Sequence, residues 1–184
     1  MKKIVLLFSG EGFNAQNIVE NLHEKECIVA CGITNRADAK GIEKLSSLGI
    51  RTEVLCHTGF DSREAFDAKL VGLIRSYEPD LVVLSGFMRI LSEVFTSNIK
   101  AINLHPSLLP KYKGAKAIEQ SFSSGDTECG VSVHWVNSEL DAGEIILQKS
   151  FIRSGDESLE SFSRKIKELE FEIMPEAIAQ VLKS

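Results

Sequence analysis

The sequence contains no hydrophobic run long enough to cross a membrane. Its first apolar run, IVLLF at residues 4–8, is far shorter than the roughly 20 residues that a spanning helix needs. Two lysines precede this run, as in a signal peptide, but the run is short and no small-residue cleavage site follows it. We therefore expect a buried first strand and a cytoplasmic protein.

The sequence also lacks any cluster of basic residues. Its formal net charge is -5, which argues against a protein that binds nucleic-acid backbones through many lysines and arginines. A small anionic substrate remains compatible with this charge, because a single site needs only a few donors. We expect small-molecule substrates and no nucleic-acid or membrane partner, and the sequence leaves monomer and homodimer open.

The cysteines form no metal-binding pattern. CIVAC spaces Cys27 and Cys31 by four residues, but no second cysteine or histidine pair accompanies them, and Cys56 and Cys129 stand alone. Cysteine in an apolar, strand-like run behaves as a small hydrophobic residue. We therefore expect reduced, buried thiols and no metal site.

The chain does contain a regular alternation of apolar strands and amphipathic helices. Its 43% hydrophobic and 26% charged residues are ordinary for a globular protein, so we expect one domain over residues 1–184. Continuous apolar runs indicate strands buried on both faces, as in parallel sheets. We predict strands at 2–9, 27–34, 51–56 and 80–86, helices at 14–25, 37–49 and 61–79, and a turn into a short helix at 86–95.

After residue 100 the pattern changes. Residues 101–105 read as a strand, and a loop follows. GVSVHWVN at 130–137 alternates strictly, which is typical of a half-buried antiparallel strand, and 144–153 resembles its hairpin partner. A long helix over 157–184, bent near Pro175, ends the chain. The pattern predicts an open, mostly parallel, Rossmann-like α/β sheet flanked by helices, with an antiparallel hairpin toward the C-terminal half.

Ligands of such sheets bind beyond the carboxyl ends of the strands. SGEGFN places Gly10 and Gly12 between the first strand and the first helix, where a backbone can approach an anion and free N–H groups can bind it. With Ala15 the stretch also fits a dinucleotide fingerprint, G-x-G-x-x-A. The acidic residue expected after the second strand is absent, and Asn35 and Arg36 stand there instead. A small phosphate is favoured, and an NAD(P) site using Arg36 stays open.

Asn103 and His105 end the strand at 101–105, in NLHPSLLP. Alternate residues of a strand share a face, so an amide donor and an imidazole could converge on one developing oxyanion. Pro106 restricts the backbone of His105 to extended forms. The pair is a candidate catalytic centre, although a solvated strand end would show the same pattern.

Three carboxylates, Glu139, Asp141 and Glu144, surround a turn in NSELDAGE. A carboxylate beside His105 would favour its imidazolium form. The same turn could equally be an ordinary acidic surface turn. His134 alternates with apolar neighbours on a strand, so we expect it to be structural.

Six segments together resemble the folate-dependent formyltransferases that act on phosphoribosylglycinamide. They are FSGEGFNAQ, FDSREAFD, SGFMRIL, INLHPSLLPKYKG, GVSVHWV and ELDAGEIILQ, in family order over essentially the whole chain. The resemblance implies transfer of a formyl group from 10-formyltetrahydrofolate, as co-substrate and without a metal, to that amine in purine biosynthesis. Another amine, of sugar-nucleotide or methionyl-tRNA type, an NAD(P)-binding oxidoreductase, and a non-catalytic folate-binding relative are the alternatives.

The resemblance also implies site residues. Asn103, His105 and Asp141 match the catalytic residues of the family. Matches to the phosphoribosyl amine site are Gly12, Phe13, Asn14 and Glu170, and matches to the folate site are Arg63, Met88, Arg89, Ile90, Leu91 and Asn103.

The phosphate loop departs from the family pattern at two positions. Phe13 stands where serine is usual, so one hydroxyl donor is missing, and Glu11 replaces a neutral residue and adds repulsion toward an anion. Backbone N–H groups can still bind phosphate. We therefore expect weakened binding of the phosphorylated amine, and a lower KM after the double change Phe13→Ser with Glu11→Asn.

Overall fold

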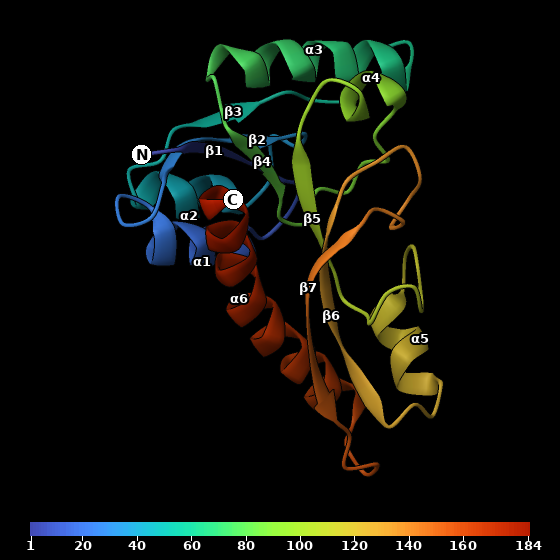
Figure 1. The fold of residues 1–184 in the computed structure, drawn as a ribbon. Helices are drawn as coiled ribbons and strands as arrows, with labels where there is room; N and C mark the ends of the chain where they lie inside the picture. The colour runs from blue at the N-terminus through green and yellow to red at the C-terminus, as the bar shows by residue number, and fades with distance from the viewer.

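Seven strands form one mixed sheet in the computed structural model, which describes residues 1–184 (Figure 1). The strand order is β3-β2-β1-β4-β5-β6-β7. Neighbours from β3 to β5 pair in parallel, whereas β5–β6 and β6–β7 pair antiparallel. The predicted sheet with its antiparallel hairpin is confirmed. The strands are β1 (Lys3–Phe8), β2 (Ile28–Thr34), β3 (Thr52–Val54), β4 (Leu81–Leu84), β5 (Ala101–His105), β6 (Glu128–Trp135) and β7 (Ile145–Ile152).

Helices cover both faces of the sheet. The helices are α1 (Phe13–Leu22), α2 (Gly41–Ser47), α3 (Arg63–Ser76), α4 (Glu93–Thr96), α5 (Ala117–Ser123) and α6 (Leu159–Lys183). α1, α2 and α6 pack on one face, and α3 and α4 pack on the other (Figure 1). α5 lies beside the far end of the β6–β7 hairpin. None of the six helices combines the length and the apolar character that crossing a bilayer would require.

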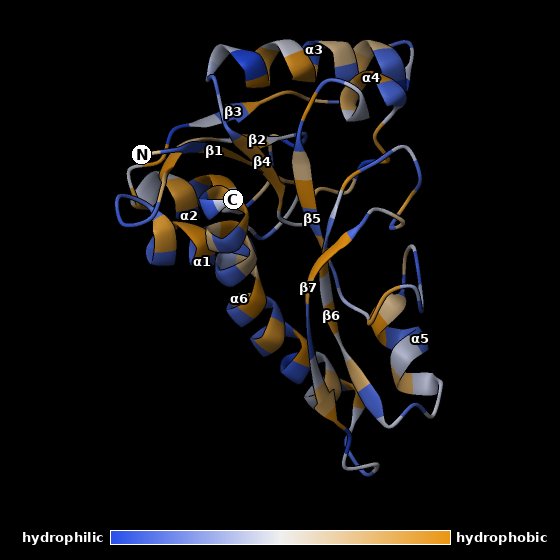
Figure 2. Cartoon of the chain, in the orientation of Figure 1, coloured by the Kyte–Doolittle hydropathy of each residue, from blue (hydrophilic) through white to orange (hydrophobic).

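The continuous apolar run of β1 divides its side chains between two cores. Leu6 and Phe8 belong to the core beneath α1 and α6, whereas Val5 and Leu7 belong to the core beneath α3. Every one of these side chains is fully buried. Figure 2 shows the apolar central strands and the polar stripes on the helices around them. The run is continuous because both faces of the strand are covered.

Hydrogen bonds from other elements explain where two helices differ from the prediction. Residues 86–91 form an irregular loop, and only Glu93–Thr96 are helical. At one end of the loop the Met88 N–H donates to Ser9 Oγ at 2.8 Å, and just beyond it the Ser92 N–H donates to Asp67 Oδ2 at 2.6 Å. Bonds to side chains just after β1 and on α3 thus replace the helical pattern expected there.

Two other helix boundaries also depend on contacts. Ser62 caps α3, accepting a hydrogen bond from Ala65 N–H at 3.1 Å, so this helix begins at Arg63, close to the predicted start at residue 61. α2 begins only at Gly41, four residues later than expected, because Arg36–Ala39 close a turn in which Ala39 N–H donates to the Arg36 carbonyl. The sequence analysis missed α5, and α6 continues through Pro175.

β6 is buried on both faces, which corrects the prediction of a half-buried strand. Its side chains are buried from Cys129 to His134, although Ser132 and His134 are polar. α6 covers one face, and the loop after β5 covers the other, where Leu109 N–H donates to Ser132 Oγ at 3.0 Å. The strict alternation therefore reflects polar partners on one face rather than water.

Three of the four cysteines are buried, as predicted. Cys27, Cys31 and Cys129 are buried free thiols, and burial raises the pKa of Cys27 to about 11. Cys56 is exposed, which corrects the expectation for that residue, because it follows the short strand β3 at the edge of the sheet.

Candidate functional site

A cavity of about 650 Å³ opens at the carboxyl ends of the central strands. From β1 the successive strands β2 and β3 lie on one side, and β4 and β5 lie on the other, so the strand order switches direction between the parallel neighbours β1 and β4. Ligands of open α/β sheets bind at such a switch point. Segments following β1, β4 and β5 line the cavity, together with residues before β7 and on α6. The segments that the sequence analysis singled out after these strands therefore meet at one place.

Gly12 shapes the first wall of the cavity. Its φ of +74° lies in the left-handed region, and an added Cβ would stand 2.4 Å from the Cα of Gly41. No side chain therefore fits where α1 and α2 begin side by side. The first N–H groups of α1 have no partner within the helix, so this wall can bind an anion.

Asn14 and Glu170 join α1 to α6 beside this wall. The Asn14 side-chain amide donates to Glu170 Oε2 at 3.2 Å, and Asn14 Oδ1 is buried without a partner. Burial raises the pKa of Glu170 above its ordinary value, although the Asn14 bond and the Lys167 charge partly offset it. Two of the four residues predicted to bind the amine substrate thus carry an unused acceptor and a desolvated carboxyl group.

Glu11 does not add the repulsion expected from the sequence. Its carboxylate pairs with Lys40 at 3.1 Å and with Lys44 at 3.6 Å. The hydrogen bond from Lys40 is the main cause that lowers the pKa of Glu11, and the charges of both lysines add to it. The expectation of an unbalanced negative charge beside the loop is therefore wrong, because α2 supplies the counter-charges.

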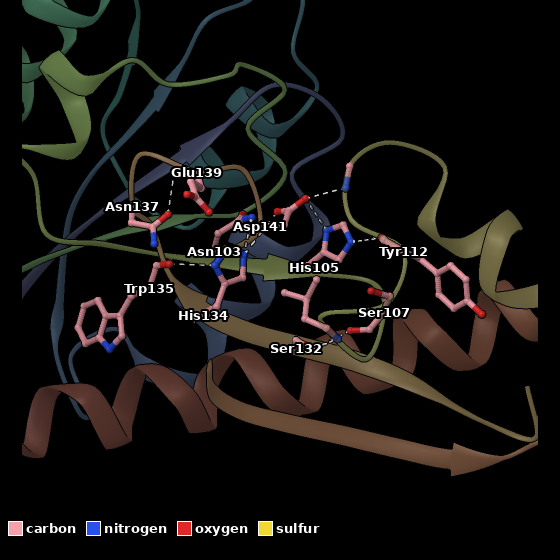
Figure 3. A network of polar contacts seen from close by, with 12 residues as sticks. Asn103, His105, Ser107, Tyr112, Ser132, His134, Trp135, Asn137, Glu139 and Asp141 are labelled. Atoms are coloured by element: carbon pink, nitrogen blue, oxygen red, sulfur yellow. Dashed lines mark hydrogen bonds and ion pairs between the residues drawn. The ribbon is translucent and has the colours of Figure 1, made fainter. Parts of the chain in front are cut away.

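Asn103 and His105 both line the cavity from the end of β5. His105 is buried, and its Nε2 lies 2.7 Å from the Tyr112 carbonyl oxygen. A carbonyl only accepts, so Nε2 carries the proton of this bond. The loop after Pro106 thus curls back and fixes the imidazole, while Nδ1 points to Asp141 (Figure 3).

Asp141 lies between the two histidines of the site (Figure 3). Its Oδ2 is 3.4 Å from His105 Nδ1 and accepts from Gly114 N–H at 2.8 Å, while its Oδ1 is 3.6 Å from His134 Nε2. Burial opposes ionisation, but His134, the Gly114 N–H and the His105 charge outweigh it and lower the pKa of Asp141. The carboxylate is therefore ionised near neutral pH.

The positions of the three carboxylates in the acidic turn separate their roles. Asp141 is 7% exposed, whereas Glu139 and Glu144 are exposed and do not line the main cavity. Asp141 has a φ of +52°, in the left-handed region, which the tight turn before β7 requires. Only this carboxylate faces the histidines.

His134 belongs to the same polar network, which the sequence analysis missed. Its Nδ1 donates to the Trp135 carbonyl at 2.9 Å, and its Nε2 lies 3.4 Å from the Asn103 side-chain nitrogen. His134 stands opposite Asn103 in the antiparallel register, so the two side chains share a face. The signal that could have placed His134 in the site is the pairing of β5 with β6, which the residue pattern of one strand does not reveal.

The opposite end of the cavity is apolar and open. Met88 is 78% exposed, Ile90 53% and Leu140 56%. The Arg89 guanidinium lies 4.9 Å from the centre of the Phe66 ring, and its Nε is buried without a partner. A smaller adjoining pocket of about 110 Å³ contains Leu91 and also touches Arg89. Four predicted folate contacts are thus brought together.

Two predicted residues lie outside this arrangement. Arg63, at the first turn of α3, is exposed and does not line either pocket. Its contact with folate stays a prediction. Arg36 is also exposed, pairs with Asp38 at 3.0 Å and is absent from the cavity walls. Arg36, which would bind the 2′-phosphate in the NAD(P) alternative, is therefore already paired with a carboxylate.

The fold and the cavity at the switch point match one family of proteins. A sequence model described as Formyl transferase matches residues 2–178, and the chain belongs to this family. Among its relatives, "Phosphoribosylglycinamide formyltransferase" of Escherichia coli (strain K12) is 42% identical over 180 residues, which cover 96% of this chain and 85% of the relative.

Solved structures give the same result. The crystal structure of phosphoribosylglycinamide formyltransferase from Campylobacter jejuni has a TM-score of 0.94 and 49% identity, covering 98% of this chain and 97% of that one. Glycinamide ribonucleotide transformylase 1 from Symbiobacterium toebii has a TM-score of 0.92 and 36% identity, covering 97% and 86%. The resemblance inferred from the six segments is confirmed at the level of the family.

Proposed function

We propose that this protein transfers the formyl group of 10-formyltetrahydrofolate to the amine of phosphoribosylglycinamide, a step of purine biosynthesis. One observation carries the proposal: Asn103, His105 and Asp141 meet in the cavity between an anion-binding helix start and an open apolar wall. The names of the relatives support the choice of substrates.

The two ends of the cavity suit the two substrates. The helix start at Gly12 and Asn14 would bind the phosphate, and Glu170 would accept hydrogen bonds from ribose hydroxyls. The exposed Met88 and Ile90 would cover the flat folate ring, which removes apolar surface from water. The reacting groups then meet between the two ends, beside Asn103 and His105.

The catalytic residues would act on the tetrahedral intermediate. The substrate amine attacks the formyl carbon, and negative charge develops on the formyl oxygen. The Asn103 amide and the Nδ1–H of a His105 imidazolium would donate to that oxygen, because His105 Nε2 is held by the Tyr112 carbonyl. One such donor is worth about 3–4 kcal/mol. Asp141, 3.4 Å from His105 Nδ1, would stabilise positive charge on the ring during the reaction.

Proton transfers would complete the reaction. The attacking amine loses a proton, which Asp141 can take through water, and the departing folate nitrogen gains one from His105. The C–N bond to the folate breaks while the new amide bond remains, and the proton taken by Asp141 then passes to His105, so charge and atoms balance and the enzyme is restored. Neither a metal nor a covalent enzyme intermediate enters these steps.

An assay of the purified protein tests this proposal. The protein is mixed with 10-formyl-folate and a panel of amines with and without phosphate, and the folate product is followed by absorbance. Turnover should be fastest with phosphoribosylglycinamide. Preference for a sugar-nucleotide amine would reassign the acceptor, and folate binding without any turnover would support the non-catalytic alternative.

A further inference from the structure

The ring of Phe13 lies close to two lysines from different helices. Lys44 Nζ of α2 is 4.5 Å from the ring centre, and Lys167 Nζ of α6 is 5.4 Å from it. The face of an aromatic ring attracts a cation at such distances. Phe13 therefore gathers two positive charges, distant in the sequence, at the first residue of α1.

Lys44 has a second contact besides the ring. The side chain of Lys44 is only 22% exposed, and its Nζ also lies 3.6 Å from Glu11 Oε2. Glu11 makes its shorter contact with Lys40, at 3.1 Å, so its single negative charge is shared between two lysines. Lys167 itself lines the cavity, as Phe13 does.

We propose that Phe13 is a positioning residue whose ring holds Lys44 and Lys167 where their ammonium groups bind the phosphate of the amine substrate. This inference rests on the proposed function and deepens it. Two charged donors would replace the single neutral hydroxyl that is missing at this position, and charged hydrogen bonds are the stronger kind. Phe13→Ser should then raise the amine KM, the reverse of the expectation from the sequence.

Three variants separate the effect of the aromatic ring from the effect of an apolar side chain. Phe13→Leu keeps an apolar side chain and removes the ring, Phe13→Trp keeps a ring, and Phe13→Ser restores a hydroxyl. The Leu and Ser variants should raise the KM of phosphoribosylglycinamide about five-fold, as expected for loss of about 1 kcal/mol of cation–ring attraction. The Trp variant should stay near the parent value, and kcat should change little in all three.

The dephosphorylated amine shows whether the effect passes through the phosphate. Its KM should be the same in Phe13→Leu and the parent protein. Phe13→Leu should also have a smaller effect in a Lys44→Gln background, since the ring would then have lost one of its two partners. Phe151→Leu, a ring removed from β7 outside the cavity walls, is the matched control.

Inorganic phosphate gives a second readout that needs no turnover. Titration followed by the amide NMR signals of Phe13 and Asn14 should give an affinity that Phe13→Leu weakens and Phe13→Trp retains. If the parent protein binds phosphate in this way but formylates no phosphorylated amine, the inference stands and the proposed function fails. The inference is overturned if the parent binds no phosphate there, or if Phe13→Leu leaves both the phosphate affinity and the amine KM unchanged.

Discussion

The two ends of the cavity differ in the chemical groups that form their walls. At the α1 end the wall is backbone, with Gly12 pressed against Gly41, and charged side chains surround it. At the β4 end the wall is a loop whose side chains, Met88 and Ile90, stand 78% and 53% exposed. The first end leaves polar groups without a protein partner, among them Asn14 Oδ1, whereas the second exposes apolar surface.

This difference teaches how one cavity can distinguish two substrates. A phosphate needs donors in fixed positions, and in the proposed function helix N–H groups and lysines would provide them. A folate ring needs apolar contact area, and the area that is covered matters more than which apolar side chain covers it. A separate polar network joins half-buried Asn103 to buried His105, His134 and Asp141 (Figure 3).

The largest effect should come from His105, which lies between the ends. His105→Ala should lower kcat by about 10²- to 10⁴-fold, the usual range for a general acid or an oxyanion donor. Both KM values should change little, because neither end of the cavity is touched. Steady-state kinetics with both substrates measures this.

Thermal unfolding and a second histidine provide the controls for that variant. The melting temperature should remain close to that of the parent protein, and His23→Ala, far from the cavity walls, should retain full activity. Near-normal turnover of a folded His105→Ala protein would contradict the catalytic assignment.

A glycine pair tests the α1 end. Gly12→Ala should destabilise the fold by at least about 2 kcal/mol, because alanine is strained at this positive φ and its Cβ meets Gly41. The amine KM should rise, and the folate KM should stay unchanged. Gly10→Ala is the control, since an added Cβ there has no neighbour within 4 Å. Equal losses in the two variants would mean that the backbone contact has no special role.

Arg89 tests the β4 end. Arg89→Met keeps the apolar stem and removes the donor whose Nε lacks a protein partner. The folate KM should rise about ten-fold, the value for losing a charged hydrogen bond of about 1.4 kcal/mol. The amine KM should stay within two-fold. Arg75→Met, on the exposed face of α3 away from the cavity, is the control. A change confined to the amine KM would show that the two ends have been assigned the wrong way round.

The smallest effect concerns Glu170 and depends on pH. Because burial raises its pKa in the folded protein, protonated Glu170 favours folding, and this contribution is lost as pH rises through the folded pKa. Glu170→Gln avoids the loss, so it should melt higher at pH 7, by about 2–4 °C at most. The gap should close below about pH 4, where the parent side chain is protonated in both states.

The same variant should weaken the amine end. Loss of the carboxylate should raise the amine KM a few-fold, since a neutral amide is the weaker acceptor for ribose hydroxyls. Differential scanning calorimetry from pH 3 to 8 and steady-state kinetics check both parts. A variant that melts lower than the parent at neutral pH would show that the charge of Glu170 stabilises the fold.

Local sequence patterns predicted much of this molecule. The apolar runs located β1, β2 and β4, since a strand buried on both faces needs apolar residues at every position. The cap at Ser62 and the glycines after β1 were readable because they satisfy requirements of their own backbone segment. Asn103 and His105 could be paired in advance, because two residues apart on a strand means one face.

Contacts between distant segments could not be read in this way. The loop at residues 86–91 resembles the start of a helix, but the side chains of Ser9 and Asp67 bind the chain at Met88 and Ser92. The alternation in β6 resembles a strand facing water, but its polar side chains face Leu109 and the site. Local propensity is a weak preference that such tertiary contacts override.

The sequence by itself thus determined the order of the strands and of every helix except α5, the carboxyl-end positions of the candidate residues and the family to which the chain belongs. Only the tertiary structure decided that Asp141 meets His105, that His134 faces Asn103, and that lysines of α2 and α6 surround Glu11 and Phe13. The physical reason is range: backbone periodicity acts over a few residues, whereas strand order and helix packing set which distant charges come within a few ångströms.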